Sequence, residues 1–134
     1  MPNTIGGTSG TGHINMVSAT SNGSIVGIHN GSTGNAAIRN NIIGGLVSPG
    51  SSAIVGGGIV GISNSAAAAS LTISGNTIGN STADNMRGGV NGVTTGSTNV
   101  AGIHLSTLPA GGTISNNTIQ NLSSYGIGTG GNAY

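Results

Sequence analysis

Few residues in this chain could carry acid–base or metal chemistry. Its 134 residues include one carboxylate (Asp84), two arginines (Arg39 and Arg87), three histidines and no cysteine. Glycoside hydrolysis normally takes a pair of carboxylates, and a calcium-assisted lyase takes several charged oxygen ligands. A single aspartate meets neither requirement, and in a segment of variable length it is not expected to complete a Ser-His-Asp triad. The sequence therefore predicts a protein that is not an enzyme and uses no cofactor.

The histidines do not form a metal site by spacing. His29 and His104 each follow a Gly-Ile pair, whereas Ser63 occupies the equivalent place between them and His13 stands alone. If equivalent residues stack, His29 and His104 lie about 10 Å apart, and metal ligands must lie about 2 Å from the ion. We interpret the histidines as outward polar residues. Asp84 and Arg87 could form an exposed ion pair, which is worth little energetically.

The overall charge excludes several partners. The formal net charge is +1, so no basic patch exists to bind nucleic acid or an anionic membrane surface. No apolar run is long enough to span a bilayer. The opening residues MPNTIGG lack the basic and apolar regions of a signal peptide, so any export signal is expected to have been removed or to lie outside this chain.

Two motifs recur along the chain and alternate with each other. The first is NTIGG (3–7), NIIGG (41–45), NTIGN (76–80) and NTIQN (117–121), at intervals of 38, 35 and 41 residues. The second is VGIHN (26–30), VGISN (60–64), AGIHL (101–105) and YGIGT (125–129). From the second motif to the next copy of the first takes 15, 16 and 16 residues, and the length variation falls in the other interval. A constant half and a variable half indicate stacked strands joined by loops of different length.

Equivalent residues of the repeats are expected to form columns. The predicted aliphatic core columns are Ile38, Ile73 and Ile114; Ile5, Ile43, Ile78 and Ile119; and Ile28, Ile62, Ile103 and Ile127. The predicted asparagine ladder is Asn3, Asn41, Asn76 and Asn117, because stacked side-chain amides can bond from one repeat to the next. A corner is predicted at Asn40-Asn41, Gly75-Asn76 and Asn116-Asn117, since Asn and Gly tolerate left-handed backbone.

These motifs carry a family resemblance. The pattern ISxNTI, followed by N and then GI, resembles the right-handed parallel β-helix repeats of the pectate-lyase-like superfamily, and in style it is most similar to repetitive secreted bacterial surface proteins. The resemblance implies an all-β chain, a parallel β-helix (β-solenoid), as one domain over 1–134 with units of about 3–40, 41–75, 76–116 and 117–134. Two alternatives remain open: about four turns decorated with loops or short hairpins, or seven to eight small turns. At about 4.8 Å per turn these would be roughly 20 Å or 35 Å tall.

The expected function is structural. Neither end shows a capping segment, and exposed strand edges template further pairing. The chain is therefore expected to be an extracellular or cell-surface building block that stacks head to tail with itself, or a slice of a long stalk. The alternative is an adhesin or carbohydrate-binding module that uses the Ser/Thr/Gly-rich inserts, although only Tyr125 and Tyr134 could serve as aromatic platforms. Ice binding is a third interpretation, but Ile42 interrupts the column of Thr4, Thr77 and Thr118.

Glycans are a candidate decoration of this nearly uncharged surface. N-x-[ST] triplets place candidate acceptors at Asn22, Asn30 and Asn80, in segments expected to be accessible. Attached sugars would help such a chain to remain in solution.

Overall fold

The computed structural model describes residues 2–16, 24–48, 58–89, 98–125 and 132–133. All regular structure in these residues is β-strand, as expected for a chain rich in Gly, Ser, Thr, Asn and β-branched residues. The strands are β1 (Thr4–Gly6), β2 (Ile14–Asn15), β3 (Ile25–Asn30), β4 (Asn35–Arg39), β5 (Ile42–Gly44), β6 (Leu46–Ser48), β7 (Ile59–Asn64), β8 (Ser70–Ser74), β9 (Thr77–Ile78), β10 (Met86–Gly88), β11 (Asn99–Leu105), β12 (Thr113–Ser115), β13 (Thr118–Ile119), β14 (Leu122–Ser124) and β15 (Asn132–Ala133).

The strands form four parallel sheets in which every fourth strand pairs. Sheet A has the order β1-β5-β9-β13, sheet B β2-β6-β10-β14, sheet C β3-β7-β11-β15, and sheet D β4-β8-β12. The chain thus passes through sheets A, B, C and D and returns to sheet A one strand further along. We call each such passage a turn. This all-β arrangement of stacked parallel sheets is compatible with the expected β-solenoid, and its strand numbers agree with four decorated turns.

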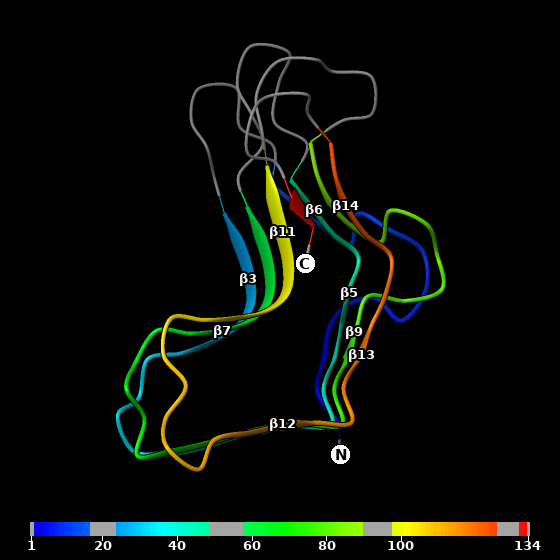
Figure 1. Cartoon of the computed structure of the whole chain (residues 1–134). Helices are drawn as coiled ribbons and strands as arrows, with labels where there is room; N and C mark the ends of the chain where they lie inside the picture. Colours follow the sequence, from blue (N-terminus) through cyan, green and yellow to red (C-terminus); the bar gives the residue numbers. More distant parts are fainter. Residues whose placement is uncertain (1, 17–23, 49–57, 90–97, 126–131, 134) are drawn as a thin grey trace.

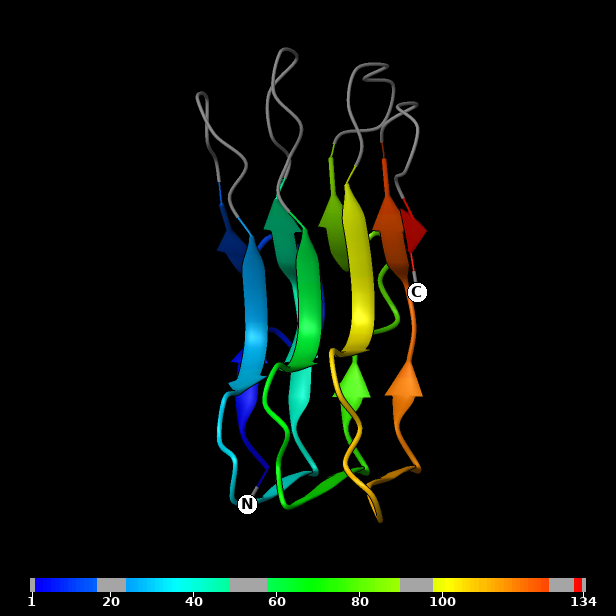
Figure 2. The same cartoon turned by 60° about the vertical axis from the view of Figure 1, so that its left-hand side comes forward.

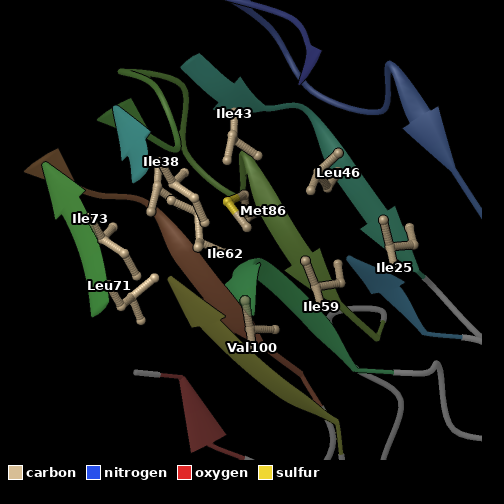
Figure 3. Packing of buried hydrophobic residues seen from close by; sticks show 11 residues of the cluster. Ile25, Ile38, Ile43, Leu46, Ile59, Ile62, Leu71, Ile73, Met86 and Val100 are labelled. Carbon is tan, nitrogen blue, oxygen red and sulfur yellow. The ribbon is translucent and has the colours of Figure 1, made fainter. Parts of the chain in front are cut away.

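The turns lie side by side along one axis (Figure 2). Seen nearly along that axis, sheet C lies on one side and sheets A and B on the other, and sheet D joins the foot of sheet C to sheet A (Figure 1). The core fills the space between these sheets. It contains Ile25, Ile38, Ile43, Leu46, Ile59, Ile62, Leu71, Ile73, Ile78, Met86 and Val100, which are drawn as sticks in Figure 3, where all but Ile78 are labelled.

Two backbone features explain why small residues recur at fixed places. The predicted corner between sheets D and A is present, with positive φ at Asn40 (54°), Gly75 (66°) and Asn116 (54°). In sheet C the glycine of the VGI motif permits close packing across the core. A Cβ on Gly61 would lie 2.6 Å from the carbonyl oxygen of Gly102 and 2.6 Å from Cγ2 of Ile78. Only glycine fits that position without displacing its neighbours.

The structure corrects two expectations about the variable segments. These segments were expected to be loops or hairpins, but each contributes a strand of sheet B: β2, β6, β10 or β14. The fourth copy of the second motif was also misaligned. Tyr125 follows β14 at the end of sheet B, and sheet C is continued by β15, where Asn132 pairs with Asn99. The reason is that the last turn, like the others, must pass through sheet B before it reaches sheet C.

Candidate functional site: the asparagine columns and the last turn

The four asparagines of the predicted ladder lie in one column. Asn3 Nδ2 donates to Asn41 Oδ1 (3.0 Å), Asn41 Nδ2 to Asn76 Oδ1 (2.9 Å), and Asn76 Nδ2 to Asn117 Oδ1 (2.9 Å). The backbone N–H groups of Asn41 and Asn76 also donate to the next Oδ1, each at 3.0 Å. Asn41 and Asn76 are buried, with 4% and 1% of their surface exposed. Each interior amide is therefore satisfied by the turns beside it, which fixes the register of the stack.

A second, shorter asparagine column was not foreseen. Asn30 Nδ2 donates to Asn64 Oδ1 (2.7 Å), and the buried Asn64 Nδ2 donates to the carbonyl oxygens of Ala66 and Thr107, both at 2.9 Å. The sequence carried a partial signal, since VGIHN and VGISN both end in Asn. The third copy, AGIHL, ends in Leu105, and this substitution hid the column.

The isoleucine columns are covered in the middle of the stack and open at its last turn. Register pairs join Ile38, Ile73 and Ile114, and likewise Ile5, Ile43, Ile78 and Ile119. A third column joins Ile28, Ile62 and Ile103, whereas Ile127 lies outside the described residues. Ile43, Ile62, Ile73 and Ile78 are fully buried, but Ile114 and Ile119 are 45% and 44% exposed. The exposed pair marks the last turn as an apolar end surface.

A polar clasp joins the first turn to the third. Residues 7–13 connect β1 to β2, and residues 79–85 connect β9 to β10. Gly10 N–H donates to Thr82 Oγ1 (3.0 Å), and Asn80 Nδ2 donates to the Gly10 carbonyl oxygen (3.1 Å). Asn85 Nδ2 donates to the same oxygen. The second turn lies between them and has only Gly45 in its connection, whose N–H donates to Asn85 Oδ1 (3.0 Å).

Two of the three candidate glycan acceptors, Asn80 and Asn30, already use their side-chain amides in hydrogen bonds. Asn80 was expected to be accessible, but it is only 5% exposed and its Nδ2 already donates to the carbonyl oxygen of Gly10. Asn30 is half-buried, and its Nδ2 donates to Asn64. A glycan on either side chain would have to replace these hydrogen bonds, which disfavours both as acceptors in the folded chain. Asn22 lies outside the described residues.

The ionisable side chains gather loosely beside sheet B. Tyr125 donates its hydroxyl proton to Asp84, at 2.8 Å and 3.0 Å from the two carboxylate oxygens. A hydrogen bond from Ser123, supported by Tyr125 and the charge of Arg87, lowers the pKa of Asp84. The same contact with Asp84 raises the pKa of Tyr125. Arg87 Nε is buried and has no hydrogen-bond partner among the described residues. Both pKa directions favour a charged carboxylate on Asp84 and a protonated phenol on Tyr125.

Two of the three histidines, His29 and His104, lie in the column that the repeat predicted. His29, Ser63 and His104 share one register column, and His29 Nε2 lies 3.2 Å from Ser65 Oγ. His13 is exposed near Gly45. In the part of the chain that the structure describes, no three His, Cys, Asp or Glu side chains gather as a metal would need. No helix among these residues could cross a membrane.

Outward threonines also follow the register. Thr4, Ile42, Thr77 and Thr118 form one column of sheet A. Ile42 interrupts the hydroxyl array, as the sequence indicated. Tyr134, the second candidate aromatic platform, lies outside the described residues.

Comparison with known proteins identifies no relative. No protein-family model, no curated protein and no solved structure matches this chain.

Proposed function

We propose that this chain is a non-enzymatic β-solenoid building block of an extracellular or cell-surface assembly. In this role, copies stack head to tail into a fibre, or further turns extend the same stack into a stalk. We also propose that the stack is a right-handed parallel β-helix whose repeats resemble those of repetitive bacterial surface proteins.

The observation that carries the proposal is the contrast along the isoleucine columns. Ile73 and Ile78 are fully buried by the turns on either side, whereas Ile114 and Ile119 in the next positions are about half exposed. An exposed apolar surface that continues a packed column is favourable to cover. A turn with the same spacing would continue both the apolar columns and the strand ladders.

The connections between sheets A and B support stacking of whole copies. They alternate along the chain: residues 7–13 in the first turn, Gly45 alone in the second, residues 79–85 in the third, and residues 120–121 in the fourth. A long connection needs a short one beside it, because the clasp passes over Gly45. With four turns per copy, the first turn of a following copy would again place a long connection next to a short one.

Composition is consistent with a passive scaffold. Repeated Ser, Thr and Asn keep the outer faces polar, while the chain has three formally charged residues. The described ionisable cluster contains one carboxylate, held in its charged form. The adhesive alternative, which assigns binding to the inserts, stays a prediction because much of those inserts lies outside the described residues.

Sedimentation velocity of purified chain over a range of concentrations tests the proposal. Ile119→Lys places a charge on the end surface, and Thr77→Lys places the same charge on the outer face of an interior turn. We expect the unmodified chain and Thr77→Lys to form large, concentration-dependent species and Ile119→Lys to remain monomeric. A monomer at all concentrations for the unmodified chain, or equal assembly by both variants, would contradict the proposal.

A further inference from the structure

The asparagine hydrogen bonds between neighbouring turns follow one repeated pattern. The backbone N–H and Nδ2 of Asn76 both donate to Asn117 Oδ1, at 3.0 Å and 2.9 Å. In return, Asn117 Nδ2 donates to the carbonyl oxygen of Ile73 in the turn before (2.9 Å). Asn76 Nδ2 makes the same contact with the carbonyl oxygen of Ile38 (3.0 Å). Each added turn therefore supplies one accepting Oδ1 and one donating Nδ2.

The last turn offers the groups that this pattern would use next. Among the described residues, the backbone N–H of Asn117 and its second Nδ2 proton make no hydrogen bond, although the equivalent groups of Asn76 both do. The carbonyl oxygen of Ile114 likewise receives no asparagine amide, in contrast to those of Ile38 and Ile73. Ile114 and Ile119 flank these groups and are about half exposed. The same edge thus carries hydrogen-bonding groups without partners among the described residues and half-exposed apolar side chains.

From this arrangement we infer that the edge formed by β12, Asn117 and β13 is a docking surface for one extended polypeptide segment with the pattern Ile-x-x-Asn-x-Ile. The segment adds a strand to sheet D, bends at its asparagine and adds a strand to sheet A. Its Asn Oδ1 accepts from Asn117, its Nδ2 donates to the carbonyl oxygen of Ile114, and its two isoleucines cover Ile114 and Ile119. This is strand addition to an open sheet edge.

The chemistry of the partner follows from the internal turns. The same pattern occurs as Ile38–Asn41–Ile43 and Ile73–Asn76–Ile78, and these segments already stack on one another. β12 (TIS) and β13 (TI) carry no charged residue, so this edge offers no opposite charge to the segment that binds it.

The described residues of the first turn match only half of this surface. Asn3 and Ile5 can cover Asn117 and Ile119, but sheet D has three strands where the other sheets have four. Among the described residues the first turn adds no strand to sheet D, so this part of the chain supplies no partner for Ile114. The preferred occupant therefore has the complete pattern. The inference deepens the proposed function and rests on it for its biological meaning, while the binding surface is defined by the last turn alone.

A synthetic peptide with the sequence of residues 70–79 (SLTISGNTIG) tests the inference directly. Binding of the fluorescently labelled peptide to the full chain would be followed by anisotropy at concentrations where sedimentation shows monomer. We expect saturable binding that becomes about tenfold weaker when the peptide's Asn is replaced by Ala, because it loses its hydrogen bonds to the edge. In the protein, Asn117→Ala should weaken binding similarly, whereas Asn3→Ala at the opposite end should not.

Ile114→Lys provides a second variant that leaves the asparagine ladder intact, and it should abolish binding. Absence of binding to the unmodified chain, or equal binding by the Asn and Ala peptides, would overturn the inference. The outcome is separate from that of the assembly experiment. Peptide binding without fibre formation supports the docking surface and contradicts head-to-tail stacking. Fibres that neither bind the peptide at their ends nor grow more slowly in its presence support head-to-tail stacking and contradict the docking surface.

Discussion

Replacing Asn76 with alanine should be among the most destabilising single changes in this chain. The Asn76 side chain is 1% exposed and takes part in four hydrogen bonds. Its Oδ1 accepts from the backbone N–H and Nδ2 of Asn41, and its Nδ2 donates to the carbonyl oxygen of Ile38 and to Asn117 Oδ1. Asn76→Ala removes all four and leaves two donors of the buried Asn41 unpaired.

The expected cost follows from these counts. A buried donor left unpaired costs about 1–3 kcal/mol, and each remaining lost bond costs about 0.5–1.5 kcal/mol. We therefore expect the free energy of unfolding to fall by about 3–9 kcal/mol, a large share of the roughly 5–15 kcal/mol typical of a domain. Asn3→Ala is the matched control, because Asn3 is exposed and its side chain donates one bond, to Asn41. Its expected cost is about 0.5–1.5 kcal/mol.

Urea unfolding followed by far-ultraviolet circular dichroism measures these differences, with the slope of the transition checked for each variant. Asn117→Ala should fall between the other two, since Asn117 is half-buried and accepts from Asn76 on one side alone. This order also remains measurable if Asn76→Ala does not fold. Equal, small losses at Asn76 and Asn3 would refute the reasoning that the column holds the turns in register.

Three further predictions follow from the packing and charges. Gly61→Ala should lower the free energy of unfolding by about 1–3 kcal/mol in urea titrations, because its Cβ would lie 2.6 Å from Ile78 Cγ2; an unchanged midpoint would contradict the close packing. Asn85→Ala should increase hydrogen exchange in residues 7–13, because it removes a bond to Gly10; unchanged exchange there would count against the clasp. The Asp84 contribution to stability should be present above the ordinary pKa of 3.8 and be lost as pH falls through its lowered folded pKa. That of Tyr125 should be present below 10.0 and be lost as pH rises through its raised folded pKa. Thermal unfolding of Tyr125→Phe across pH should lack the alkaline loss, and an unaltered alkaline profile would exclude the contact.

Sheets A and D and most of sheet C could be predicted from the sequence because their residues repeat. Asn and Ile at fixed spacing indicate a column, because each member of the column packs against the equivalent residue of the neighbouring turn. Gly75 and Asn116 reported the corner for a similar reason, because few residues tolerate positive φ. The predictable sheets are therefore those in which the same residue type occupies the same position in successive turns.

Sheet B and the clasp could not be predicted in the same way. The strands of sheet B read IN, LVS, MRG and LSS, which share no motif and are too short to show a period. Their conformation is set by the strands on which they stack. The clasp joins Gly10 to Asn80, residues separated by 70 positions, so neither side is visible in the other's local sequence. The burial of Asn80 follows from that distant contact, which explains why it was expected to be accessible.

Electron microscopy of the purified, unmodified chain is the most direct test of the central claim that its turns continue from one copy to the next. Head-to-tail stacking predicts uniform fibres with a strand spacing of about 4.8 Å along the axis and a subunit repeat of about 19 Å, four strand spacings. Ile119→Lys should prevent these fibres. Separate particles one copy tall, unchanged as concentration rises, would contradict the account.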